Sequence, residues 1–127
     1  MGYESTIYFV RPFKELKNEC EIIASLEMCN MGHTRAVEAF KKLFDTPIDF
    51  KLYLPECDED YKNCLVSKDR YGEPLKTGDT DKMYEAIRTV LYEDPDEGSG
   101  YWRFDILKDM LFAFRPYKDV YVVHYGH

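Results

Sequence analysis

Hydrophobic and polar residues alternate with a period of two near the start of the chain, which is typical of half-buried β-strands. In YESTIYFV (residues 3–10), Ser5, Ile7 and Phe9 fall on one side of the pattern, and Pro12 ends it. The strict alternation resumes after residue 18 and favours a second strand, which we expect to pair with the first as a hairpin. One face of this second strand carries Cys20, Ile22, Ala24, Leu26 and Met28.

Three other segments show hydrophobic residues at helical spacing. Thr34 can cap the first, and Thr80 or Asp81 can cap the second, because their side-chain oxygens accept hydrogen bonds from the first backbone amides of a helix. In the third, Ile106 is one of the residues expected to face inward. The predicted helices are 35–44, 82–93 and 102–114.

Three further strands complete the expected order. They are 48–54 (IDFKLYL), 64–67 (CLVS) and 119–125 (DVYVVHY), whereas 68–79 is predicted to be a loop because it is rich in Gly and Pro. The order β-β-α-β-β-α-α-β indicates one α+β domain over residues 1–127. We expect a mainly antiparallel sheet of about five strands, with three helices packed on one face.

Composition and charge narrow the classes of function. The chain has 127 residues, of which 45% are hydrophobic, and a formal net charge of −7. No basic face is visible, so direct binding to nucleic acid is disfavoured, whereas attraction to a basic partner is favoured. The 11 tyrosines suit either packing across strands or a surface for protein recognition. We expect neither a secretory signal nor a membrane span, and place the protein in the cytoplasm.

Two of the three histidines, His124 and His127, lie close together at the end of the chain. His124 shares a strand face with two valines, so we interpret it as a partly buried side chain that is satisfied by one hydrogen bond. His127 is the last residue, and a general base must be held more firmly than that. A catalytic pair is therefore not expected.

The cysteines predict free thiols, and no metal site or cofactor. No C-x-x-C pair occurs, and Cys29 with His33 supplies too few ligands for zinc. Cys20 lies on an apolar strand face, where a thiol acts as a small hydrophobic group. The other two cysteines, Cys57 and Cys64, flank an acidic connection.

Two acidic clusters are the candidate contacts with a partner. The second begins like a calcium loop, but Pro95 and the lack of a glutamate at the twelfth position break that match. Both read most simply as solvated loops. If they lay on one side of the molecule, they could imitate a phosphate backbone and occupy a nucleic-acid groove on a basic partner. The candidate residues are Glu56, Asp58, Glu59 and Asp60, together with Glu93, Asp94, Asp96, Glu97, Tyr101 and Trp102.

The common sequence motifs of enzymes are absent. There is no G-x-S-x-G, Walker A, H-E-x-x-H or G-x-G-x-x-G. We therefore do not expect an enzyme, although paired catalytic carboxylates would leave no local motif.

Three segments together resemble a group of small uncharacterised proteins encoded by bacteriophages and prophages. They are MGYESTIYFV at the start, DRYGEPL in the middle and VVHYGH at the end. The resemblance follows most of the chain in order. It implies no activity and no catalytic residue, but it does imply a phage setting and action in the bacterial cytoplasm. Small acidic phage proteins without enzyme motifs are often inhibitors of host defence, including anti-CRISPR proteins.

The leading hypothesis is therefore a non-enzymatic phage accessory protein that binds and inhibits a bacterial host protein with a basic surface. A nucleic-acid-dependent defence complex is one such target. The first alternative is a small-molecule or nucleotide-binding protein, a sponge for a signalling nucleotide, in which Arg70, Arg103 or His124 converge on a pocket. The second is an enzyme of unrecognised type. The sequence leaves the oligomeric state open.

Overall fold

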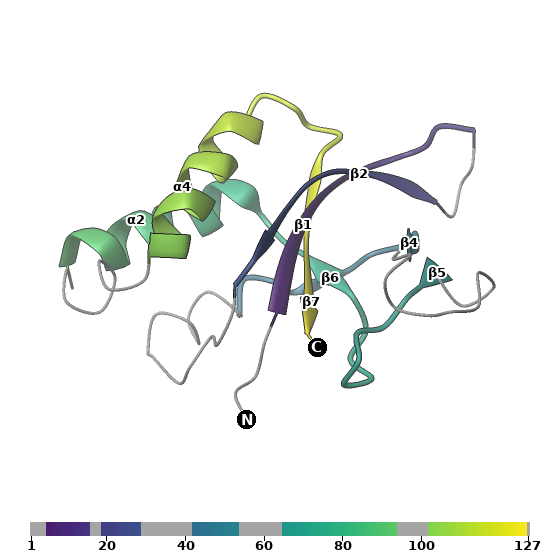
Figure 1. Cartoon of the computed structure of the whole chain (residues 1–127). Coiled ribbons are helices and arrows are strands. Elements are labelled where there is room, and N and C mark those ends of the chain that lie inside the picture. Colours follow the sequence, from purple (N-terminus) through teal and green to yellow (C-terminus); the bar gives the residue numbers. More distant parts are fainter. Residues whose placement is uncertain (1–4, 16–18, 29–41, 54–64, 94–101, 127) are drawn as a thin grey trace.

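A computed structural model of the chain describes residues 5–15, 19–28, 42–53, 65–93 and 102–126, with the side chains of 90–93 and 102 left aside. Its central element is a five-stranded sheet with the order β2-β1-β7-β6-β3 (Figure 1). Every pair in it is antiparallel, so the predicted antiparallel sheet is confirmed. The strands are β1 (Ser5–Pro12), β2 (Cys20–Glu27), β3 (Thr46–Pro47), β6 (Lys76–Thr77) and β7 (Tyr121–Gly126).

Two helices, α2 (Thr80–Glu93) and α4 (Trp102–Phe114), lie side by side on one face of the sheet (Figure 1). These are the second and third predicted helices. The described part of the chain contains two helices where three were predicted. Most of the predicted helix 35–44 lies outside that part, and its last residues, 42–44, form a turn and an irregular stretch rather than a helix.

The sheet is buried on both faces, because β7 and β1 contribute side chains to two separate hydrophobic clusters. On the helical side, Ile7 and Val122 pack with residues of α2 and α4 that include Met83 and Leu107. On the opposite side, Val10, Val123 and Tyr125 pack with Phe50, Leu52 and Leu75. This second layer also holds a small antiparallel pair, β4 (Leu52–Tyr53) with β5 (Leu65–Val66).

A β-bulge in β2 changes which face its residues occupy. Phe9 pairs with Ala24 but Val10 pairs with Ile22, so Ile23 is an extra residue in β2. Such an insertion twists the strand and resets the alternation of its side chains. The prediction that one face carries all five apolar residues is therefore wrong. Ala24, Leu26 and Met28 join the helical cluster, whereas Cys20 and Ile22 join the opposite one.

Two predictions for the middle of the chain are also corrected. Within the described part of the predicted strand 48–54, only Leu52–Tyr53 form a strand, β4, because residues 49–50 form a bend. The preceding strand, β3, belongs to a different sheet from β4. Phe50 and Leu52 are buried in the second cluster, and Ile48 packs against it. In addition, residues Lys76–Thr77 of the predicted loop form β6, which lies between β7 and β3 in the sheet and pairs with both.

Candidate functional site on the helical face

None of the ten predicted contact residues has a described side chain. Glu93 and Trp102 mark the ends of α2 and α4, with only their backbone described, and the other eight lie outside the described residues. The flanking elements are nevertheless informative. The first acidic cluster lies in the segment between β4 and β5, and the second lies in the segment between α2 and α4. The β4–β5 pair and the two helices lie on opposite sides of the main sheet (Figure 1). The elements that flank the first acidic cluster therefore belong to a different layer of the fold from those that flank the second.

His124 is partly buried, as predicted from its position beside two valines. Its backbone lies opposite Ile7 on one side and Lys76 on the other. Its ring centroid is 5.5 Å from that of Phe44, on the helical side of the sheet. His127 lies outside the described residues, so the predicted absence of a catalytic pair stays a prediction.

Cys20 is the cysteine that the structure describes, and it is buried as predicted. Its Sγ donates a hydrogen bond to the carbonyl oxygen of Lys51, at 3.5 Å. Burial raises the pKa of this thiol to about 11, and the charge of Glu19 adds to the effect. A thiol with a pKa in this range is unreactive at neutral pH.

The described residues include no group of three or more His, Cys, Asp or Glu side chains placed to bind a metal ion. In the same part of the chain, neither helix combines the length and the apolar character that crossing a membrane requires.

The two arginines proposed for a nucleotide pocket are attached to different strands, and His124 belongs to one of these strands, β7. Arg103 Nε donates to the carbonyl oxygen of Glu27 at the end of β2, at 2.7 Å. The backbone amide of Arg70 donates to the carbonyl oxygen of Gly126 at the end of β7, at 3.1 Å. Since β1 separates β2 from β7, the two arginines are anchored two strands apart at one end of the sheet.

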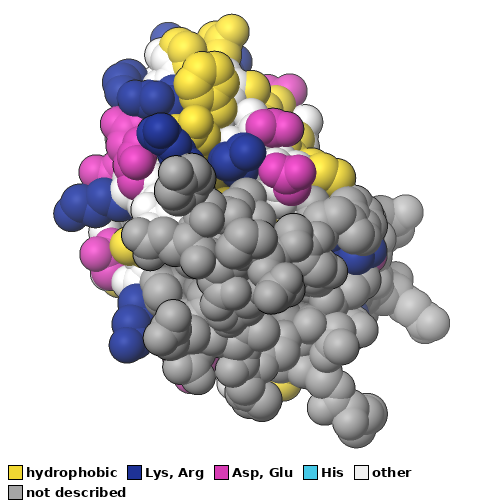
Figure 2. All heavy atoms as spheres, turned by 90° about the vertical axis from the view of Figure 1, so that its left-hand side faces the viewer, with side chains coloured by type: hydrophobic (Ala, Val, Ile, Leu, Met, Phe, Trp, Pro, Cys, Tyr) yellow, Lys and Arg dark blue, Asp and Glu magenta, His cyan; other side chains and the backbone are white. Residues whose placement is uncertain are grey.

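The outer face of the two helices carries exposed hydrophobic side chains that belong to neither core cluster. Figure 2 shows such side chains gathered in the upper part of this side of the molecule, with Lys, Arg, Asp and Glu beside them. Phe112 of α4 is 57% exposed and Ile106 is 39% exposed. The prediction that Ile106 faces inward is therefore wrong. Exposed aromatic residues next to charged ones are typical of protein interfaces.

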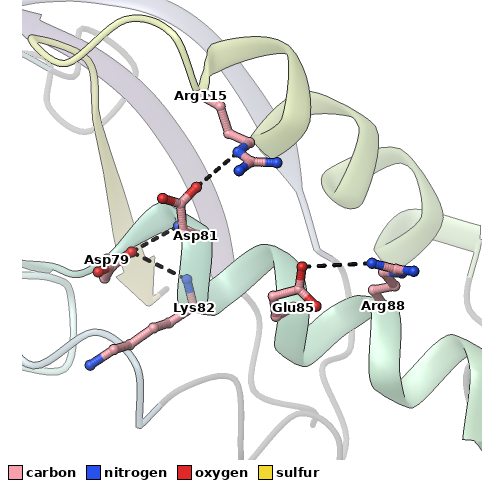
Figure 3. Close-up of polar contacts among 6 residues, drawn as sticks. All are labelled: Asp79, Asp81, Lys82, Glu85, Arg88 and Arg115. Carbon is pink, nitrogen blue, oxygen red and sulfur yellow. Dashed lines mark hydrogen bonds and ion pairs between the residues drawn. The ribbon is translucent and has the colours of Figure 1, made fainter.

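One connected group on this face, the aromatic–arginine cluster, comprises Asp81, Tyr84, Phe112 and Arg115, of which Tyr84 is partly buried against the helical core. The Tyr84 and Phe112 ring centroids are 5.7 Å apart, so the group bridges α2 and α4. The guanidinium carbon of Arg115 lies 5.8 Å from the Tyr84 centroid and 5.9 Å from that of Phe112. Its Nε is 2.9 Å from Asp81 Oδ1 (Figure 3).

This cluster was not predicted, yet the sequence contains a signal for it. Phe112 lies off the apolar stripe of α4, and a large aromatic residue at such a position is exposed once the stripe is buried. The contact with Arg115 and Tyr84 could not be predicted, because it depends on how two helices joined by residues 94–101 pack together.

Comparison of the chain with protein-family models, with curated proteins and with solved structures finds no match.

Proposed function

We propose that the protein is a non-enzymatic binding protein that inhibits a bacterial host protein by surface contact, and that the aromatic–arginine cluster is an anchor of that contact. The observation that carries this proposal is the 57% exposure of Phe112 beside Tyr84 and Arg115. Aromatic residues and arginine dominate the few side chains that supply most of the energy of protein interfaces.

The cluster is also held in place before any partner binds. The ion pair with Asp81 and the two rings beneath the guanidinium fix the Arg115 side chain. An exposed ion pair of this kind contributes little to stability, since water and salt screen it. Its value lies in preorganisation, because a side chain that is already ordered loses less entropy on binding.

The acidic clusters give the proposal its electrostatic part. Residues 54–64 contain four acidic residues and one lysine, and residues 94–101 contain three acidic residues, so these segments account for most of the net charge of −7. A basic partner surface would be attracted to them over a distance set by ionic strength. Because their flanking elements lie in different layers, we treat each cluster as a separate contact and not as one imitation of a phosphate backbone.

The setting of the proposal, a phage protein acting on a host defence complex, rests on the resemblance of the three terminal and central segments to phage and prophage proteins. It is tested by affinity capture from a bacterial lysate, with the wild-type chain and two variants as bait. Phe112→Ser removes the exposed ring of the cluster. Phe13→Ser is the matched control, since Phe13 is 42% exposed in the connection between β1 and β2.

We expect Phe112→Ser to lose the captured protein and Phe13→Ser to retain it. Removing a central aromatic residue from an interface costs about 2 kcal/mol or more, which is roughly a 30-fold loss of affinity. Circular dichroism should show that both variants keep the fold. Equal capture of the same protein by both variants would show that the cluster is not the anchor. Replacing Glu56, Asp58, Glu59 and Asp60 with serine at low salt tests the electrostatic part separately.

A further inference from the structure

The outer edge of β2 presents unpaired backbone groups. β2 is an end strand of the five-stranded sheet, with β1 on its inner side (Figure 1). In an antiparallel ladder, residue pairs that exchange hydrogen bonds alternate with pairs whose amide groups point away from each other. The amide of Met28 donates to the carbonyl oxygen of Ser5, at 2.8 Å, so this pair is of the first kind. The register then places Ser25 and Glu27, opposite Tyr8 and Thr6, in pairs of the second kind.

The backbone N–H and C=O groups of Ser25 and Glu27 therefore face outward. The position of Arg103 supports this assignment independently, because its Nε donates to the outward carbonyl oxygen of Glu27, at 2.7 Å. At the other end of β2, Glu19 forms a parallel bridge with Lys51. Within the described chain, the outer edge between these two contacts has no strand partner. Ile23, at 38% exposure, and Ser25 are open to solvent.

The charges along this edge select the kind of strand that could pair with it. Glu21 and Glu27 are exposed and flank Ile23 and Ser25. A second copy of the chain would bring the same two glutamates to the shared edge from both strands. The added negative charge disfavours self-pairing, because like charges repel one another along a strand pair. A segment with basic residues on either side of an apolar one would instead match the edge in both charge and hydrophobicity.

We propose that the outer edge of β2 is a docking site for an extended, basic segment of a partner protein, which adds to the sheet as a further strand. In this mode of recognition the main-chain hydrogen bonds supply affinity and the alternating side chains supply specificity. The site lies on a different element from the aromatic–arginine cluster, so it stands or falls independently of the function proposed above.

A short synthetic peptide of alternating lysine and valine is the probe, and binding to the full chain is measured by calorimetry at low salt. Amide hydrogen exchange then reports whether Ser25 becomes protected. Two further peptides serve as controls: alternating glutamate and valine, and the lysine–valine peptide with N-methylated backbone amides. On the protein side, Ser25→Pro removes the outward N–H, whereas Ser25→Thr keeps it. Because this N–H faces away from β1, proline there breaks no bond of the sheet.

We expect the lysine–valine peptide to bind and to protect the Ser25 amide, with affinity reduced about tenfold or more by Ser25→Pro and unchanged by Ser25→Thr. The glutamate–valine and N-methylated peptides should not bind. The proposal is overturned if the lysine–valine peptide fails to bind, if the N-methylated peptide binds equally well, or if the glutamate–valine peptide does. If the protein forms a dimer and Ser25→Pro abolishes that dimer, the edge pairs with a second copy of the chain and the proposal is overturned. Should Ser25→Pro not fold, the N-methylated peptide decides the question with the unmodified protein.

Discussion

Asp69 accepts a hydrogen bond from the backbone amide of Gly126, 57 residues further along the chain, at 3.3 Å. Its other carboxylate oxygen accepts the amides of Tyr71 and Glu73, at 2.9 and 3.0 Å. One side chain therefore shapes the turn of DRYGEPL and fastens it to the end of β7. Ser5 of β1 lies opposite Gly126 in the sheet. The described parts of MGYESTIYFV, DRYGEPL and VVHYGH thus meet at one corner of the fold, which gives them a structural role.

Replacing Asp69 with alanine should destabilise the protein by roughly 1–3 kcal/mol, because the partly buried amide of Gly126 would lose its acceptor. Chemical denaturation measures this change. Asp109→Ala, at an exposed acidic position of α4, is the control and should stay within about 0.5 kcal/mol of the wild type. If both variants unfolded at the same denaturant concentration, the turn would not depend on Asp69.

Two glycines should respond differently to alanine, for different physical reasons. A Cβ at Gly78 would lie 1.9 Å from the carbonyl oxygen of Leu43 and 2.9 Å from Met83 Cε, so the backbone of two segments would have to separate. Gly72 has a φ of +82° but nothing within 4 Å of such a Cβ. We expect Gly72→Ala to cost about 1 kcal/mol through conformational strain alone.

Gly78→Ala should cost more than about 3 kcal/mol or prevent folding, since overpacking against backbone leaves no side chain to move aside. Thermal unfolding of both variants makes the comparison. A similar melting temperature for the two variants would show that the backbone at Leu43 moves away from position 78 at little cost in free energy.

The sequence predicted those elements whose own residues determine them. The β1–β2 hairpin and α4 follow from local periodicity, and their bounds agree with the structure within a few residues. Elements that depend on distant partners were missed. β6 consists of two residues of a Gly- and Pro-rich segment, and it is a strand because Lys76 lies opposite His124. The bulge at Ile23 was hidden for the same reason, since only pairing with Phe9 and Val10 reveals an extra residue.

The candidate site divides in the same way. Exposure of Phe112 could be inferred from the pattern of α4, but the approach of Tyr84 and Arg115 could not. The outward amide of Ser25 required the register of β2 against β1, which no single-strand pattern contains.

The N-terminus of α2 offers a test of helix capping. Asp79 Oδ1 accepts the amides of Asp81 and Lys82, at 2.9 and 3.2 Å, so Asp79 is the cap and the predicted choice of Thr80 or Asp81 was wrong (Figure 3). Three neighbouring residues of capping type made the choice ambiguous. Asp79→Ala should destabilise the protein by about 1 kcal/mol, and Asp79→Ser should restore most of that loss. Urea denaturation checks both, and an equal loss in Thr80→Ala would contradict the assignment.

Cys20 should be unreactive and should make stability depend on alkaline pH. In a variant with serine at the other three cysteine positions, a pKa of about 11 leaves roughly 100-fold less thiolate than the ordinary value of 9.0. Alkylation at pH 8 should therefore be slower than for the unfolded chain by about that factor. Since folding favours the neutral thiol, unfolding releases a proton between pH 9 and about 11, and stability falls as the pH rises through this window. Cys20→Ala should lack this part of the fall. Rapid alkylation of the folded variant, or identical pH profiles for the two proteins, would show that the thiol is not buried as the structure places it.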